Sequence, residues 1–210
     1  MRLRKIKNID EKIKKFAGII IFEPQNLKGL WHKEFANDKP IYLEIGTGKG
    51  QFIIKNAEQN PEINFIGCEI SDSVIYKAAV KAKEIPNLRL INIDASLLND
   101  VFIDHEITQI YLNFSDPWPK ARHEKRRLTS SSFLNIYKMI LVKQGIIEFK
   151  SDNQNLFEYS LIRFNEQRWD FIDLNLDLHK ENNEDIITTE YEDKFRALGN
   201  KIYYIKVRIK

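Results

Sequence analysis

The order of short apolar runs and longer helix-like segments constrains the fold of this chain more than any other feature. Five runs have the length and composition of buried strands, and three segments between them have helical character. The strand-like runs are 41–45, 63–70, 88–93, 107–114 and 145–150, and the helix-like segments are 50–60, 72–85 and 130–141. Strands that alternate with helices at this spacing are typical of βαβ units, which build a parallel sheet.

The last third of the chain adds further elements. We predict a helix over 153–165, strands over 169–176 and 201–209, and a short helix near 193–198. No repeat, low-complexity tract or Gly/Ser linker divides the chain. We therefore predict one α/β domain over residues 1–210, with a basic N-terminal arm over about 1–30. Its sheet is expected to be doubly wound, seven-stranded and mostly parallel, and one of the last strands can be antiparallel.

Composition excludes several classes of protein. The longest apolar run, 16–22, is far shorter than the ~20 residues that cross a bilayer, and the first ten residues lack the apolar stretch of a secretory signal. A single cysteine, Cys68, excludes an internal disulfide and a cysteine-rich metal cluster. We expect a soluble, cytoplasmic protein with no membrane partner and no bound metal.

Basic residues are concentrated in three segments, although the net charge is only +3. Residues 1–15 carry +5, residues 120–127 carry +4 and residues 201–210 carry +4, so the remaining residues carry −10. Basic segments on an acidic body suggest a polyanionic partner, and nucleic acid is the first candidate. Runs of charge are commonly no more than solvated surface, and for residues 1–15 alone we favour that interpretation.

A glycine-rich loop follows the first predicted strand. Residues 44–50 read EIGTGKG, at a strand-to-helix turn where nucleotide-like ligands bind in such sheets. The third glycine comes one residue earlier than in the dinucleotide-binding pattern G-x-G-x-x-G, and Glu44 precedes the loop. The pattern resembles the first motif of Rossmann-like class I S-adenosylmethionine (SAM) methyltransferases. Glycines at such a turn can also be merely structural.

Two more acids stand at the ends of predicted strands. Glu69 follows the glycine loop by about 20 residues, where a carboxylate can accept hydrogen bonds from ribose hydroxyls. Asp94 ends the next strand and is placed to contact the edge of an adenine. A lone acid at a strand end is commonly only a helix cap, but three acids at three successive strand ends favour a cofactor site.

The most specific segment is 114–128, FSDPWPKARHEKRRL. Two prolines stiffen a loop that holds Trp118 and Asp116 at the carboxyl edge of the sheet. Together with LEIGTGKGQF, SDN and TTEYEDKF, this segment resembles the bacterial tRNA (guanine-N7-)-methyltransferase family, from about His32 to Ile209. Ser151 is a mild departure, because threonine is at least as frequent there.

The resemblance implies a class I methyltransferase that uses SAM to methylate N7 of a guanosine in tRNA. The expected acceptor is the variable-loop guanosine, at position 46 of the tRNA. Residues implied in SAM binding are Glu44, Gly46, Gly48, Gly50, Glu69, Asp94 and Asp116, of which Asp116 is also the catalytic candidate. Residues implied in binding guanine and tRNA are Lys120, Arg122, His123, Lys125, Arg126, Arg127, Asp152, Thr189, Glu190, Tyr191 and Glu192. A monomer and a homodimer both remain open.

The chemistry of the acceptor agrees with these roles. Guanine N7 has an available lone pair, so its attack on a methyl group needs no general base, and catalysis rests on positioning. Carboxylates that hold the guanine donors and favour positive charge on the purine supply the electrostatic part. We therefore expect Asp116 and Asp152 to position and stabilise rather than to abstract a proton.

Other functions explain less of the sequence. A nicotinamide-dependent oxidoreductase accounts for the sheet, the glycine loop and Glu69, but not for the early third glycine or the DPWP loop. A non-catalytic RNA-binding protein accounts for the basic segments, but not for acids at every cofactor position. A small-molecule methyltransferase has no use for three basic segments.

Overall fold

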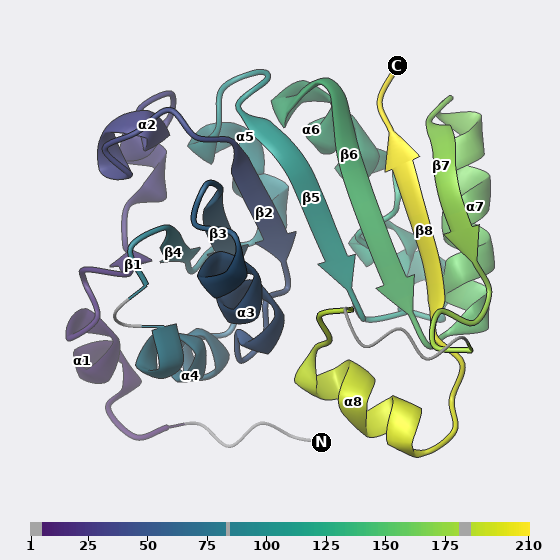
Figure 1. The fold of residues 1–210 in the computed structure, drawn as a ribbon, viewed down its shortest axis with the longest axis horizontal. Helices are drawn as coiled ribbons and strands as arrows, with labels where there is room; N and C mark the ends of the chain where they lie inside the picture. Colours follow the sequence, from purple (N-terminus) through teal and green to yellow (C-terminus); the bar gives the residue numbers. More distant parts are fainter. Residues whose placement is uncertain (1–5, 83–84, 181–185) are drawn as a thin grey trace.

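A computed structural model describes residues 6–82, 85–180 and 186–210. In this part of the chain the centre is an eight-stranded sheet in the order β1-β4-β3-β2-β5-β6-β8-β7 (Figure 1). Its strands are β1 (Ile20–Ile21), β2 (Ile41–Ile45), β3 (Asn64–Cys68), β4 (Leu88–Ile91), β5 (Ile107–Asn113), β6 (Leu141–Ser151), β7 (Asp170–Asn175) and β8 (Tyr203–Arg208). Along this order, each pair of neighbouring strands from β1 through β4, β3, β2 and β5 to β6 is parallel. β8 is antiparallel to both β6 and β7.

Helices cover both faces of this sheet. The α-helices are α1 (Ile9–Lys14), α2 (Trp31–Glu34), α3 (Gln51–Gln59), α4 (Asp72–Ala82), α5 (Leu98–Val101), α6 (Ser131–Ile140), α7 (Gln154–Glu166) and α8 (Glu190–Ala197). The short 3-10 helices are η1 (Pro24–Leu27), η2 (Ala95–Leu97) and η3 (Ala121–Arg126). Side chains of α1, α3 and α4 share one buried cluster, and those of α2, α5, α6 and α7 share the other. α8 lies at the edge of the sheet to which the arrows of β5 and β6 point (Figure 1). None of the helices in the described ranges has the length and apolarity of a membrane span.

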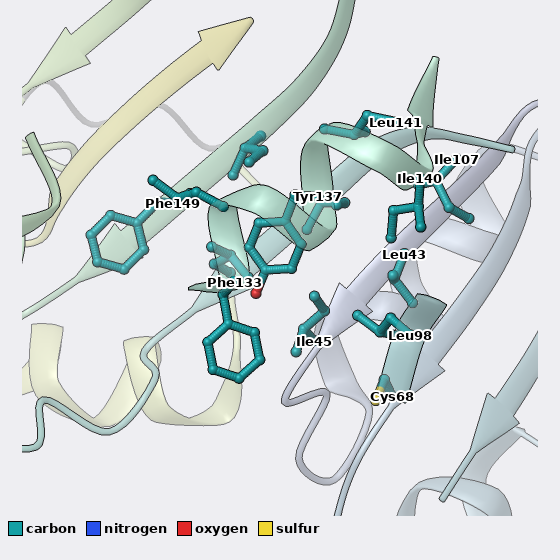
Figure 2. Packing of buried hydrophobic residues seen from close by; sticks show 14 of the residues in the cluster. Leu43, Ile45, Cys68, Leu98, Ile107, Phe133, Tyr137, Ile140, Leu141 and Phe149 are labelled. Carbon is teal, nitrogen blue, oxygen red and sulfur yellow. The ribbon is translucent and has the colours of Figure 1, made fainter. Parts of the chain in front are cut away.

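The alternation of side chains along each strand explains the two clusters. Leu43 and Ile45 of β2 pack in the larger cluster, which also holds Tyr137 of α6, whereas Tyr42 packs against the smaller one (Figure 2). Successive side chains of a strand point to opposite faces, and here both faces are covered. This is why the central strands read as continuous apolar runs in the sequence.

The predicted doubly wound, mostly parallel sheet is confirmed, but the described part has eight strands and not seven. The additional strand is β1, where Ile20 pairs with Leu90 and Ile21 with Ile91 of β4. It lies in the segment that we assigned to the basic arm. Two residues are too few to produce a periodic pattern, and their strand character comes from pairing with the outer edge of β4.

The third basic segment, residues 201–210, lies in and beside β8. Lys206 Nζ lies 3.0 Å from an oxygen of Glu148, and Lys210 Nζ lies 3.4 Å from an oxygen of Asp170. These lysines are paired with acids of the neighbouring strands β6 and β7. The charge of this segment therefore contributes to pairing within the sheet, which the charge count along the sequence did not reveal.

Candidate functional site

A cavity of about 680 Å³ opens where the strand order reverses. β2 and β5 are neighbours there, and such a switch point at the carboxyl ends of parallel strands is the usual place for a ligand. Three acids expected from the sequence, Glu69, Asp94 and Asp116, line the cavity together with Gly46. The wall also includes apolar and basic residues, among them Ile45, Ile93, Trp118, Lys125, Arg126, Leu128 and Phe133.

The glycine loop is tied to the end of β3. The backbone N–H groups of Gly46 and Thr47 both donate to the carbonyl of Cys68, at 2.8 and 3.0 Å. Gly46, Gly48 and Gly50 have φ angles of +79°, +60° and +84°, in the left-handed region where a side chain is disfavoured. The sequence of the loop thus allows a turn that brings Gly46 to the cavity wall.

The third glycine serves the packing of two helices. A Cβ atom at Gly50 would lie 3.0 Å from Cβ of Ala78 and 3.0 Å from Cδ1 of Ile54. At Gly46, in contrast, no atom lies within 4 Å of the corresponding Cβ position. Gly50 therefore lets α3 begin close against α4, whereas Gly46 leaves space at the cavity.

Glu69 occupies the position expected for a ribose-binding carboxylate. Its Oε2 accepts a hydrogen bond from Gly48 N at 3.1 Å, and its Oε1 accepts one from Ser71 N at 2.9 Å. Burial raises the pKa of Glu69, while these backbone hydrogen bonds act in the opposite direction. A carboxylate has about four acceptor sites, so it keeps acceptor capacity for a ligand hydroxyl. Asp94 is exposed, and its Oδ1 accepts from Ser96 N at 2.8 Å.

Glu44 lies beneath the glycine loop and outside the described wall of the cavity. It is 1% exposed, its Oε2 accepts from Thr47 Oγ1 at 2.6 Å, and its Oε1 accepts from Asn113 Nδ2 at 2.8 Å. Burial raises the pKa of Glu44 to about 7, although the two hydrogen bonds lower it. Its contact with SAM stays a prediction, and the structure gives it a second task, supporting the loop from below.

Asp116 projects from a loop with unusual backbone angles. The residue is exposed and lines the cavity. Phe114 and Trp118, two residues away on either side, have φ angles of +52° and +40°. Non-glycine residues in this region cost about 1–2 kcal/mol each and persist where surrounding contacts hold them. The sequence indicated a stiff loop from its prolines, but not this strain.

The basic segment 120–127 surrounds Trp118. The guanidinium carbon of Arg126 lies 4.8 Å from the centre of the Trp118 ring, and the His123 ring meets it edge-on at 5.6 Å. Four cations of the segment are exposed, namely Lys120, Arg122, Lys125 and Arg126. Arg127 is half-buried and donates to the carbonyl oxygens of Pro117 and Trp118. The segment therefore contains exposed cations and one half-buried arginine that donates hydrogen bonds to the protein backbone.

Residues 189–192 lie at the start of α8 and are held by contacts inside the protein. Thr189 Oγ1 accepts from the Glu192 N–H at 2.9 Å, in a capping box that fixes the start of the helix. The Glu192 carboxylate is fully buried, 3.3 Å from Lys150 Nζ and 2.7 Å from His179 Nε2. Glu190 pairs with Lys81 of α4 at 2.6 Å. Of the expected tRNA-binding residues in this segment, Glu192 thus has its polar contacts inside the fold.

Tyr191 and Asp152 are the members of the expected guanine site that face outward. Tyr191 is 42% exposed, and its ring stacks on Phe195 at 4.1 Å and contacts Phe114 at 5.1 Å. Its hydroxyl donates to Asp152 Oδ2 at 3.4 Å. Like charge from Asp116 contributes, after burial and Asp152, to the raised pKa of Tyr191. The structure therefore brings Tyr191 against Asp152 and, through Phe114, against the loop of Asp116, although these residues are far apart in the sequence.

Several supporting residues were not expected from the sequence. Asn113 and Thr47 hold Glu44, while Lys150 and His179 hold Glu192. Nothing in their spacing distinguishes them from ordinary polar residues in strands and loops. In the described ranges, no three His, Cys, Asp or Glu side chains are arranged to hold a metal ion.

Relatives of this chain share one name. A family model described as "Putative methyltransferase" matches residues 38–205. A tRNA (guanine-N(7)-)-methyltransferase of Bacillus subtilis (strain 168) is 52% identical over 209 residues, which are 99% of this chain and 98% of that protein. A Bacillus licheniformis protein of the same name is 50% identical over 208 residues, 98% of each chain.

A solved structure supports the fold independently. The 16S rRNA methyltransferase KamB superposes with a TM-score of 0.65 at 14% identity, over 87% of this chain and 93% of KamB. At such low identity the similarity shows the fold alone, and it confirms the predicted methyltransferase fold. The family match and the identity over nearly the full length go further: the chain belongs to the tRNA (guanine-N(7)-)-methyltransferase family.

Proposed function

We propose that this protein transfers the methyl group of SAM to N7 of a guanine in tRNA, and that the acceptor is the variable-loop guanosine. One observation carries the proposal: the wall of one cavity includes both carboxylates and exposed cations. Glu69 and Asp94 line it with the glycine loop, and Lys125 and Arg126 line it from the basic segment. A cationic cofactor and a polyanionic substrate can thus meet there.

The residues of the cavity fit SAM. The remaining acceptor capacity of the Glu69 carboxylate is available to a ribose hydroxyl, and Asp94 is exposed beside the apolar Ile93. Phe133 and Leu128 supply further apolar wall for an adenine ring. The three carboxylates favour the positive sulfonium and amino groups of SAM.

We assign the phosphate contacts to the exposed cations Lys120, Arg122, Lys125 and Arg126. Such contacts supply affinity and register but little sequence information. We assign the guanine to Asp152 and Tyr191, which contact each other, with Asp152 accepting from the exocyclic donors of the base. A paired guanine must leave its stack to reach them.

SAM supplies the methyl group, so that a bond from N7 to carbon forms while the carbon–sulfur bond breaks and S-adenosylhomocysteine leaves. The protein contributes position and charge. Asp116 lines the cavity, and its negative charge contributes to the raised pKa of both Glu69 and Tyr191. There it favours the positive charge that develops on the purine. We further propose a single domain that acts in the cytoplasm, where its tRNA substrate is found.

The proposal is tested by nucleoside mass spectrometry on unmodified tRNA incubated with the purified protein and SAM. We expect new 7-methylguanosine, and we expect it to disappear when the variable-loop guanosine is replaced by adenosine. A methylated guanosine that persists in this mutant tRNA would refute the variable-loop assignment. A different methylated nucleoside would refute the N7 assignment, and RNA binding without methylation would favour a non-catalytic RNA-binding protein.

A further inference from the structure

We propose that Arg127 is a positioning residue, which holds the loop of Asp116 and Trp118 in shape and does not bind tRNA phosphate. The expected effect on catalysis rests on the proposed function. The role of Arg127 in holding the loop rests on hydrogen-bond geometry. It divides the basic segment 120–127 into an outer group that faces RNA and one arginine that faces the protein.

The guanidinium of Arg127 is committed to the backbone of the DPWP loop. Its Nε donates to the carbonyl oxygens of Pro117 and Trp118 at 3.1 and 3.3 Å, and its Nη2 donates to Trp118 O at 3.1 Å. Two nitrogens of a rigid fork therefore hold two successive carbonyl groups. Lysine cannot reproduce this geometry, because its ammonium is a single point of charge on a flexible stem.

The loop needs such a contact. Trp118 has a φ angle of +40°, a backbone conformation that residues other than glycine rarely adopt. Pro117 and Pro119 lack N–H groups, so the loop has few backbone donors to stabilise itself. The hydrogen bonds from Arg127 favour this conformation, and with it the place of Asp116, the residue directly before Pro117.

Arg127 is itself fixed by α7 and η3. Its guanidinium carbon lies 4.3 Å from the centre of the Tyr159 ring, and the Tyr159 hydroxyl donates to Glu124 Oε1 at 2.8 Å. Glu124 belongs to η3, and its carbonyl accepts from the Arg127 N–H at 2.9 Å. A closed set of contacts thus joins α7, η3 and the DPWP loop through one arginine.

The neighbours of Arg127 differ from it in exposure and in their hydrogen bonds. Arg122 and Lys125 are exposed, and Arg126 is exposed with its guanidinium over the ring of Trp118. They have the accessibility that phosphate contacts require, whereas Arg127 is half-buried and two of its three guanidinium nitrogens donate to the DPWP loop. The sequence alone presents Lys125, Arg126 and Arg127 as three equivalent cations.

The test compares Arg127→Lys with Arg122→Gln in the full-length protein. For R127K we expect kcat to fall at least about tenfold, in line with the large effect of small misplacements. We expect its KM for tRNA and the salt dependence of tRNA binding to stay within twofold of wild type. For R122Q we expect the reverse, a raised KM and a salt slope lower by about 1.

Fluorescence of Trp118 gives a readout that needs no turnover. Trp31 and Trp169 are buried, so acrylamide reports mainly on the half-buried Trp118, with Trp118→Phe as the blank. We expect quenching to increase at least about twofold in R127K, because the released loop exposes the indole. Tyr159→Leu, which removes the stacked ring but keeps the charge, should shift kcat and quenching in the same directions.

Wild-type kcat in R127K, combined with a raised KM or a lower salt slope, would overturn the inference and make Arg127 an RNA contact. Unchanged quenching in both R127K and Y159L would overturn it as well. If R127K does not fold, Y159L alone decides between these outcomes. If the wild-type protein does not methylate tRNA, the proposed function fails, and the quenching measurements still test the clamp on Trp118.

Discussion

The side-chain amide of Asn113 donates a hydrogen bond to Glu44 across 2.8 Å, at the carboxyl ends of the adjacent strands β5 and β2. The same carboxylate accepts from Thr47 of the glycine loop. One buried acid therefore connects the loop at the cofactor end of the cavity with the strand that leads to Asp116. Because burial also raises the pKa of this acid, we expect the stability of the protein to depend on pH.

We predict that the free energy of unfolding falls as pH rises from about 4.5 to about 7. Burial holds a proton on Glu44 up to about pH 7, whereas the unfolded chain releases it near 4.5. The unfolded state binds fewer protons in this window, so rising pH favours unfolding, by up to about 3 kcal/mol from this group. Urea denaturation at several pH values measures the slope.

The matched variant for this prediction is Glu44→Gln. Glutamine keeps the shape, accepts from Asn113 and donates to the Thr47 hydroxyl, but it does not titrate. We expect its unfolding free energy to change less with pH than that of the wild type. Identical slopes for the two proteins would show that Glu44 is not the group responsible.

The role of Asp116 predicts a selective loss of turnover. Replacing Asp116 with asparagine removes a negative charge at the cavity without removing bulk, so stabilisation of the developing purine charge is lost. We expect kcat to fall about 10²–10³-fold, with a small change in the tRNA dissociation constant. Steady-state kinetics and filter binding measure the two quantities. Equal losses in both would contradict an electrostatic role.

The glycine loop predicts different effects for two alanine substitutions. Gly46 and Gly50 both have positive φ angles, so both variants carry the same backbone strain, about 1–2 kcal/mol. Only Gly50→Ala adds close contacts with Ala78 and Ile54, which cost roughly 1–3 kcal/mol more. Thermal unfolding should rank G50A below G46A in stability. Calorimetric titration should show that G46A, with its methyl group at the cavity, binds SAM more weakly than wild type.

The start of α8 allows a comparison of two glutamates two residues apart. Glu192 is fully buried against Lys150 and His179, whereas Glu190 pairs with Lys81 where both side chains are partly exposed. Glu192→Gln leaves Lys150 without its charged partner and should cost about 3–5 kcal/mol of unfolding free energy. Glu190→Gln should cost less than about 1 kcal/mol. Similar midpoints of urea denaturation for the two variants would contradict a structural role for the buried Glu192.

The exposed cations predict the salt dependence of tRNA binding. Each of Lys120, Arg122, Lys125 and Arg126 that contacts a phosphate contributes nearly one unit to the slope of log affinity against log salt concentration. Replacing any two of them with glutamine should lower the slope by about 2, with the midpoint of urea denaturation as the control for folding. A slope that remains at the wild-type value would exclude them from phosphate binding.

Much of this fold and part of its site could be predicted from sequence. The strands β2 to β5 and the helices α3, α4 and α6 were predicted because their signals are local, namely apolar runs and helical spacing. The glycine loop and the acids Glu69, Asp94 and Asp116 were placed at one cavity, because parallel strands bring their carboxyl ends to one edge. β1 was missed, because its two residues are strand only through their pairing with β4.

What the sequence by itself determined is the alternation of elements, the edge of the sheet at which the cavity opens, and membership of a family by its motifs. Tertiary structure alone decided which members of a motif face outward. Arg126 and Arg127 are adjacent and chemically identical, yet one lies over Trp118 at the cavity and the other binds the backbone beneath it. The physical reason is that burial and hydrogen-bond partners come from segments distant in sequence, such as Tyr159 for Arg127 and Lys150 for Glu192.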